Sequence, residues 1–161
     1  MSLDPLNEAL YSFKLARGHL ARAGRLLALG DRAGAVHFAQ LAVENFAKAI
    51  VALYEVPTWS HDPSSQLLRL LDKVPQSLAE EVRELASIAR ENSSQSTEAD
   101  LLPALKGEAW VSEMSIYGEP SGGLTPDDIY TEAHARGFVA KALRAREIVA
   151  KVFEALKVAV D

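Results

Sequence analysis

The segment from Val36 to Tyr54 is apolar on almost every side when its residues are placed on an α-helix. The apolar side chains form two arcs, one on each side of a short polar row: Phe38, Leu41, Ala42, Phe46, Ala49, Ile50 and Leu53 in the first arc, and Val36, Val43, Ala47, Val51 and Tyr54 in the second. Each arc needs a packing partner, and such a helix is typical of the centre of a bundle. The sequence therefore predicts an all-α fold around this helix.

The polar row consists of Gln40, Glu44 and Lys48, one helical turn apart. Glu44 precedes Lys48 by four residues, the favourable order for a helical ion pair of about 0.2 to 0.5 kcal/mol. Because exposed ion pairs contribute little to stability, we expect this row to be a solvated edge between the two arcs. The alternative is a buried, paired network, in which Lys48→Ala would be more damaging than Phe46→Ala.

Helix start and stop signals divide the rest of the chain into further helices. Asp-Pro and Thr-Pro pairs mark starts, and Gly30 marks a stop. We predict one domain over residues 1–161, an up-and-down antiparallel bundle of about five to six helices. The predicted helices cover residues 5–29, 31–57, 62–71, 77–91 and 98–114, and a last helix starts at Thr125-Pro126.

The last predicted helix carries a regular apolar seam with heptad spacing. It is made of Ala135, Phe138, Ala142, Ala145, Val149, Val152 and Leu156. We expect this seam to pack within the chain against the first two helices; a dimer seam is the alternative. The first helix also has an outer apolar arc, Tyr11, Leu15, Leu26 and Leu29, which one short domain would leave uncovered. We therefore expect a homodimer, through either helix.

The central helix and the turn after it carry a recognisable pattern. AQxAxExxxKA occupies residues 39–49, followed by Pro57, by Ser60-His61-Asp62 and by a leucine-rich helix with Leu67, Leu68, Leu70 and Leu71. Later features are Tyr117, Pro120, Pro126 and Tyr130, a tyrosine before a proline-containing loop and a second tyrosine that opens the last helix. Over most of residues 6–158 the chain resembles the HEPN family, the higher eukaryotes and prokaryotes nucleotide-binding domain.

The HEPN resemblance implies a nucleotide- or RNA-associated domain, often paired with a minimal nucleotidyltransferase in toxin–antitoxin systems. Active ribonucleases of the family use an R-x(4–6)-H motif without a metal. The chain has one literal match, Arg32 to His37, but it lies too early in the fold, and Arg90 is followed by no histidine until His134. We therefore expect a non-catalytic binding module. A metal-independent endoribonuclease and a protein-interaction scaffold without a nucleotide ligand are the alternatives.

Composition excludes several other classes. The chain contains no cysteine, so it has no disulfides, thiol nucleophile or iron–sulfur cluster. No apolar run approaches the roughly 20 residues of a membrane span, and we expect a cytoplasmic protein without a membrane contact. We expect no cofactor and no metal site.

The net charge of −5 conceals basic ends and an acidic middle. Lys14, Arg17, Arg22 and Arg25 occur in the first helix without an acid between them, and a second basic cluster lies in the last helix. Such cations attract phosphate. The candidate ligand-binding residues are His61, Tyr130, His134, Arg136, Lys141 and Arg144. For His61-Asp62 the alternative is a helix cap that locks the turn.

Overall fold

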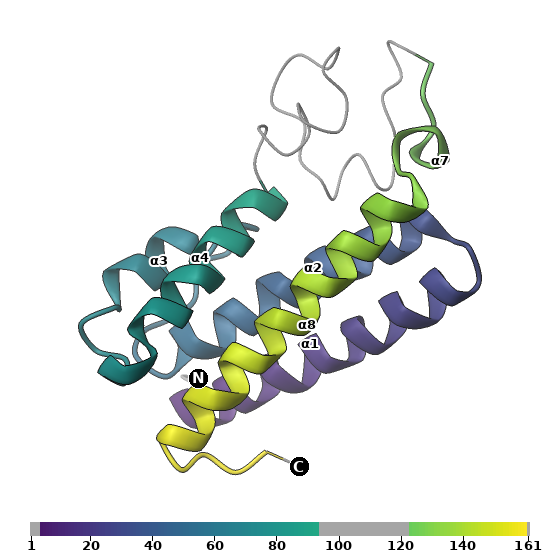
Figure 1. The fold of residues 1–161 in the computed structure, drawn as a ribbon. Coiled ribbons are helices and arrows are strands. Elements are labelled where there is room, and N and C mark those ends of the chain that lie inside the picture. Colours follow the sequence, from purple (N-terminus) through teal and green to yellow (C-terminus); the bar gives the residue numbers. More distant parts are fainter. Residues whose placement is uncertain (1–3, 94–122, 161) are drawn as a thin grey trace.

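The computed structural model describes residues 4–93 and 123–160 as a helical bundle (Figure 1). The elements are α1 (Pro5–Ala28), α2 (Arg32–Ala52), α3 (Ser64–Arg69), a 3-10 turn η1 (Gln76–Leu78), α4 (Ala79–Ser93), α7 (Pro126–Ile129) and α8 (Glu132–Ala155). These described residues contain no β-strand. The all-α prediction is confirmed, whereas the helix expected at 98–114, Tyr117 and Pro120 lie outside the described residues.

Gly30 and Asp31 form the turn between α1 and α2. Gly30 adopts a positive φ of 81°, which glycine tolerates without a steric cost. The amide of Asp31 donates to the Leu26 carbonyl at 2.9 Å and that of Gly30 to the Leu27 carbonyl at 3.1 Å, which is the Schellman pattern. The Asp31 carboxylate then accepts from the Gly34 amide at 2.8 Å and caps α2. The predicted stop and start are thus confirmed.

The helix α2 lies at the centre of the bundle and packs on α1, α3, α4, α7 and α8. Successive long helices α1, α2, α4 and α8 alternate in direction (Figure 1). The helix α8 crosses α1 and α2, while α3 and α4 cover another side of α2, and both chain termini lie at one end of the bundle. In this described part of the chain, no helix is both long enough and apolar enough to cross a membrane.

Three phenylalanine rings join the long helices in the core. The Phe46 ring of α2 lies 5.5 Å from the Phe13 ring of α1, and the Phe13 ring lies 5.2 Å from the Phe153 ring of α8. All three residues are buried, and Phe46 is not exposed at all. The helix α2 therefore buries most of both apolar arcs, as its sequence predicts, whereas Phe38, Leu41, Leu53 and Tyr54 are partly buried.

The seam of α8 packs within the chain. Six of its seven residues are buried in the single chain, and only Leu156, at 40% exposed, reaches the surface. Alanines at positions such as Ala142 and Ala145 let α8 approach its neighbours closely. The expectation of an intrachain seam is confirmed, and the six buried residues of the seam are not available for a dimer contact because the chain itself covers them.

The last helix is divided in two, which corrects the prediction of one helix from Thr125-Pro126. Thr125 is the N-cap residue of α7, and its amide and hydroxyl donate to the Asp128 carboxylate at 2.8 and 2.7 Å. Tyr130 then adopts an extended conformation, and Thr131 starts α8 with a second cap on His134. Thr125 and Thr131, six positions apart, can each start a helix, and the chain uses both because the helix is broken between them.

Phe46→Ala should lower the free energy of unfolding by about 3 to 5 kcal/mol, because a fully buried ring that links two helices leaves a cavity. Tyr11→Ala is the matched control: Tyr11 is 64% exposed, and its loss should change stability by at most about 0.5 kcal/mol. Urea denaturation measures both. A Phe46→Ala cost as small as that of the control would contradict the central position of α2.

Candidate functional site

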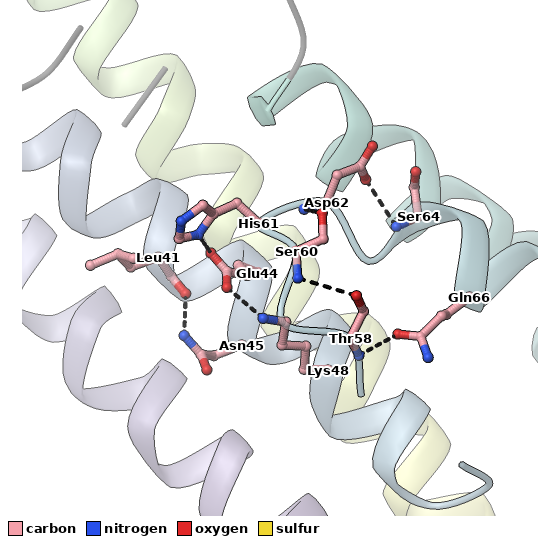
Figure 2. Close-up of polar contacts among 10 residues, drawn as sticks. All are labelled: Leu41, Glu44, Asn45, Lys48, Thr58, Ser60, His61, Asp62, Ser64 and Gln66. Atoms are coloured by element: carbon pink, nitrogen blue, oxygen red, sulfur yellow. Dashed lines mark hydrogen bonds and ion pairs between the residues drawn. The ribbon is translucent and has the colours of Figure 1, made fainter. Parts of the chain in front are cut away.

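A carboxylate is buried in the middle of α2. Glu44 is 7% exposed, and its two oxygens have different partners (Figure 2). Lys48 Nζ, one turn further along α2, donates to Oε1 at 2.7 Å. His61 Nδ1, in the turn before α3, lies 3.0 Å from Oε2. The carboxylate therefore ties this turn to the central helix.

A ladder of short polar contacts holds the turn that carries His61 (Figure 2). The amide of Thr58 donates to Gln66 Oε1 at 2.8 Å, and the amide of Ser60 to Thr58 Oγ1 at 3.1 Å. The Asp62 carboxylate accepts from the Ser64 amide at 2.9 Å at the start of α3. Asp62 thus holds the turn, as one alternative predicted, although the N-cap residue of α3 is Pro63, while His61 contacts a residue 17 positions earlier, which the sequence does not reveal.

The expectation that Gln40, Glu44 and Lys48 form a solvated edge is wrong. Gln40 and Glu44 are 2% and 7% exposed, and only 14% of the Lys48 side chain is exposed. The residues of the turn and of the helices around α2 cover the row, so the ion pair is nearly buried. Gln40 Oε1 is buried without a hydrogen-bond partner among the described residues.

The candidate ligand residues Tyr130 and His134 take part in contacts that stabilise the fold. Tyr130 is 1% exposed, and its ring lies 6.1 Å from that of Phe138 in an edge-on contact. His134 completes the cap of α8: its amide donates to Thr131 Oγ1 at 3.2 Å, and its Nδ1 accepts from the Thr131 amide at 3.3 Å. A ligand would have to displace these contacts, so the role predicted for both residues stays a prediction.

Acidic side chains accompany the basic residues of α8 that were candidates for phosphate binding. Their ion pairs are Arg136–Glu132 at 2.7 Å, Lys141–Glu91 at 3.1 Å and Arg144–Glu84 at 2.8 Å. The hydrogen bond from Arg144 lowers the pKa of Glu84, and the same bond raises the pKa of Arg144. The structure does not gather His61 with this group, and a phosphate would have to compete with a carboxylate for each of these three cations, so their predicted role stays a prediction.

The cations on the outer face of α1 differ from those of α8 in their ion pairing. A groove of about 510 Å³ runs along it, lined by Tyr11, Lys14, Leu15, Gly18, His19, Ala21, Arg22 and Arg25. We call this groove the α1 groove. Among the described residues, Lys14, Arg22 and Arg25 form no ion pair. This groove is therefore a basic surface whose charge is not neutralised by neighbouring acids.

Two histidines and an arginine surround the Phe38 ring beside the α1 groove. Ring centroids of His19 and His37 lie 5.7 and 5.1 Å from that of Phe38, and the Arg22 guanidinium lies 4.8 Å from it. Burial lowers the pKa of both histidines, and the charge of Arg22 lowers the pKa of His19 further. The lowered pKa favours the neutral form of both imidazoles, in which each ring has one donor and one acceptor nitrogen.

A family model described as the HEPN domain matches residues 9–115, which is more than half of the chain. The chain belongs to the HEPN domain family. The matched range includes the α1 groove, the Glu44 network and α4, and ends before α7 and α8. No curated protein and no solved structure matches the chain. The resemblance carried by residues 39–71 is thus confirmed.

In this HEPN domain the two residues of the literal R-x(4)-H match, Arg32 and His37, have separate structural contacts. Arg32 Nη2 donates to the Asp127 carbonyl at 2.7 Å and ties α2 to α7, whereas the His37 ring packs on Phe38. Arg90 donates from Nε to Ser64 Oγ at 3.2 Å. Across the described residues, no three histidines or carboxylates are close enough to hold a metal ion.

Lys48→Met should lower the free energy of unfolding of this HEPN domain by about 3 to 5 kcal/mol, because the buried Glu44 carboxylate would lose its ammonium partner. The double variant Glu44→Leu with Lys48→Met should recover most of that loss, since it removes the buried charge as well. Urea denaturation of both variants, with exposed Lys73→Met as the control, measures the coupling. A Lys48→Met cost equal to the control would show that the pair is effectively solvated.

Proposed function

We propose that this HEPN domain is a non-catalytic binding module for the phosphates of a nucleotide or RNA, and that the α1 groove is its binding surface. HEPN domains are in general associated with nucleotides and RNA. One observation carries the location: Lys14, Arg22 and Arg25 form no ion pair in the described part of the chain, whereas the candidate cations of α8 are paired.

The cations of the α1 groove have a geometry that suits a chain of phosphates. Lys14, Arg22 and Arg25 lie along one face of the helix and span about 17 Å at the helical rise of 1.5 Å per residue. Each phosphate that they neutralise releases counterions, so binding should weaken as salt rises. The net charge of −5 limits general adsorption of nucleic acid and leaves this face as the attractive region.

A metal-independent endoribonuclease is the second candidate function, and the contacts around Phe38 favour it. The imidazoles of His19 and His37 and the Arg22 guanidinium all contact the Phe38 ring, and burial favours the neutral form of both imidazoles. A neutral imidazole can accept a proton from a ribose hydroxyl, and a guanidinium can stabilise a phosphate. The family's R-x(4–6)-H motif is missing from the later part of the chain, and for this reason we place binding first.

Replacing Lys14, Arg22 and Arg25 together by Gln should reduce binding of a labelled single-stranded RNA at low salt by at least tenfold, since three phosphate contacts would be lost. The matched control replaces the exposed cations Lys73, Arg83 and Arg146 by Gln, which changes the net charge equally and should leave binding nearly unchanged. Fluorescence anisotropy in EDTA measures the affinity, and a gel of the same samples measures cleavage.

Each other outcome of this experiment favours a different function. RNA cleavage in EDTA that His19→Ala or His37→Ala abolishes would overturn the non-catalytic proposal in favour of the endoribonuclease. Equal losses in the triple variant and in its control would show that the α1 groove is not the surface. No binding at low salt would favour a protein-interaction scaffold without a nucleotide ligand.

We further propose that the domain is a homodimer, as HEPN domains often are. Exposed apolar residues occur where α1 begins and α8 ends, at the same end of the bundle (Figure 1): Leu6 is 42% exposed, and Leu156 and Val160 are 40% exposed. A two-fold contact there would leave the α1 groove open. We also propose a minimal nucleotidyltransferase as the partner, because the family resemblance implies this class of protein. Co-purification tests this partner. The same resemblance is the basis on which we propose a cytoplasmic location.

Sedimentation at micromolar concentration should give twice the chain mass of 17.5 kDa. Leu6→Glu with Leu156→Glu should convert the dimer to a monomer, because charged side chains would have to be buried in the contact. Leu143→Glu, at an exposed position in the middle of α8, is the control and should remain dimeric. A wild-type chain that sediments as a monomer would contradict the dimer.

A further inference from the structure

Small residues open a gap in the middle of the α1 groove. Gly18 has no side chain and Ala21 has only a methyl group, while Tyr11 and Leu15 stand on the N-terminal side and Arg22 and Arg25 on the other. A helical side chain covers the surface over the turn that precedes it. Gly18 therefore leaves uncovered the surface over the turn that contains Lys14 and Leu15.

This gap is open space and not a place where another helix approaches. A Cβ atom built on Gly18 would meet no other atom within 4 Å. Glycine is costly inside a helix relative to alanine, by about 1 kcal/mol, and no packing contact in the described structure requires it here. The Tyr11 ring at the end of the groove is 64% exposed, and Leu15 beside it is 37% exposed.

We propose that the gap at Gly18, together with the Tyr11 ring, is a subsite for an unstacked nucleobase of the bound ligand; this inference rests on the phosphate binding proposed above. A base presents a flat apolar face that stacks on an exposed aromatic ring, while the phosphates on either side of it meet cations. Lys14 follows Tyr11 by one turn, and Arg22 and Arg25 lie beyond the gap.

The ligand class that fits is a single-stranded nucleic acid. In a duplex the base faces are stacked on one another, so a duplex could offer phosphates to Lys14, Arg22 and Arg25 but no base to Tyr11. An acidic peptide could likewise meet the cations, but it has no planar group for the ring. The base-binding part of the groove therefore distinguishes these ligands.

The experiment compares four probes of matched charge by fluorescence anisotropy: a single-stranded adenine RNA decamer, an abasic decamer, a short RNA duplex and a polyglutamate peptide. Tyr11→Ala should weaken binding of the RNA decamer by about tenfold or more, as loss of a stacking ring does. Tyr11→Phe should restore it, since the ring is what stacks. Binding of the abasic decamer should be the same for all three proteins.

Gly18 provides an independent steric test. Gly18→Leu should fill the gap and weaken binding of the RNA decamer to the level of the abasic decamer. Gly24→Leu is the matched control, because a Cβ at Gly24 also meets nothing within 4 Å and Gly24 does not line the α1 groove. Circular dichroism of both variants verifies that the helical fold is kept.

Different results would overturn the base subsite and the phosphate binding proposed for the α1 groove. Equal wild-type affinity for the RNA decamer, the abasic decamer and the duplex would overturn the base subsite and leave phosphate binding intact. An equally tight polyglutamate complex, or a Gly18→Leu variant that binds RNA like the wild type, would also overturn the subsite. A wild-type protein that binds none of the nucleic acids would overturn phosphate binding and the subsite together.

Discussion

The buried carboxylate of Glu44 is the interaction on which the arrangement around α2 depends. An unpaired charge at this depth would cost several kcal/mol, so the fold has to provide partners for both oxygens. Lys48 comes from the same helix, and His61 comes from the turn before α3. By fixing that turn on the central helix, Glu44 also fixes where α3 starts and therefore where α4 packs.

The position of α4 in turn decides which cations of the domain are available to a ligand. Glu84 and Glu91 of α4 pair with Arg144 and Lys141 of α8, so the acidic middle of the sequence neutralises its basic end. The helix α1 packs mainly on α2 and α8, and among the residues that the structure describes its cations Lys14, Arg22 and Arg25 form no ion pair with an acid. Unpaired cations therefore remain on the outer face of α1, although the chain as a whole has a negative net charge.

Local signals were sufficient to predict most of the helices that the structure describes. Gly30 and Asp31 mark the first turn because the hydrogen bonds that they form all join residues close in the sequence. The seam of α8 follows from the periodicity of its apolar residues. The contact of Glu44 with His61 could not be predicted, because it joins residues that only the tertiary fold brings together. The same reason explains why Lys141 and Arg144 of α8 appeared free in the sequence and are paired with residues of α4 in the structure.

Two other features were present in the sequence but ambiguous. Two capping residues, Thr125 and Thr131, stand six positions apart, and only the extended Tyr130 shows that both are used. Gly18 is an unfavourable residue within an otherwise good helix sequence. This signal could have indicated the α1 groove if the sequence had shown that Gly18 lies on the outer face of α1. Fold and helix bounds thus follow from local chemistry, whereas the candidate site follows from which charges the packing leaves unpaired.

The location of the ligand surface is the central claim, and a residue-resolved NMR titration of the labelled domain with a short single-stranded RNA tests it most directly. Amide resonances of residues 11–25 in α1 should shift progressively with added RNA at low salt, while those of residues 136–151 in α8 should stay in place. Shifts confined to α8, or spread evenly over both helices, would contradict the account.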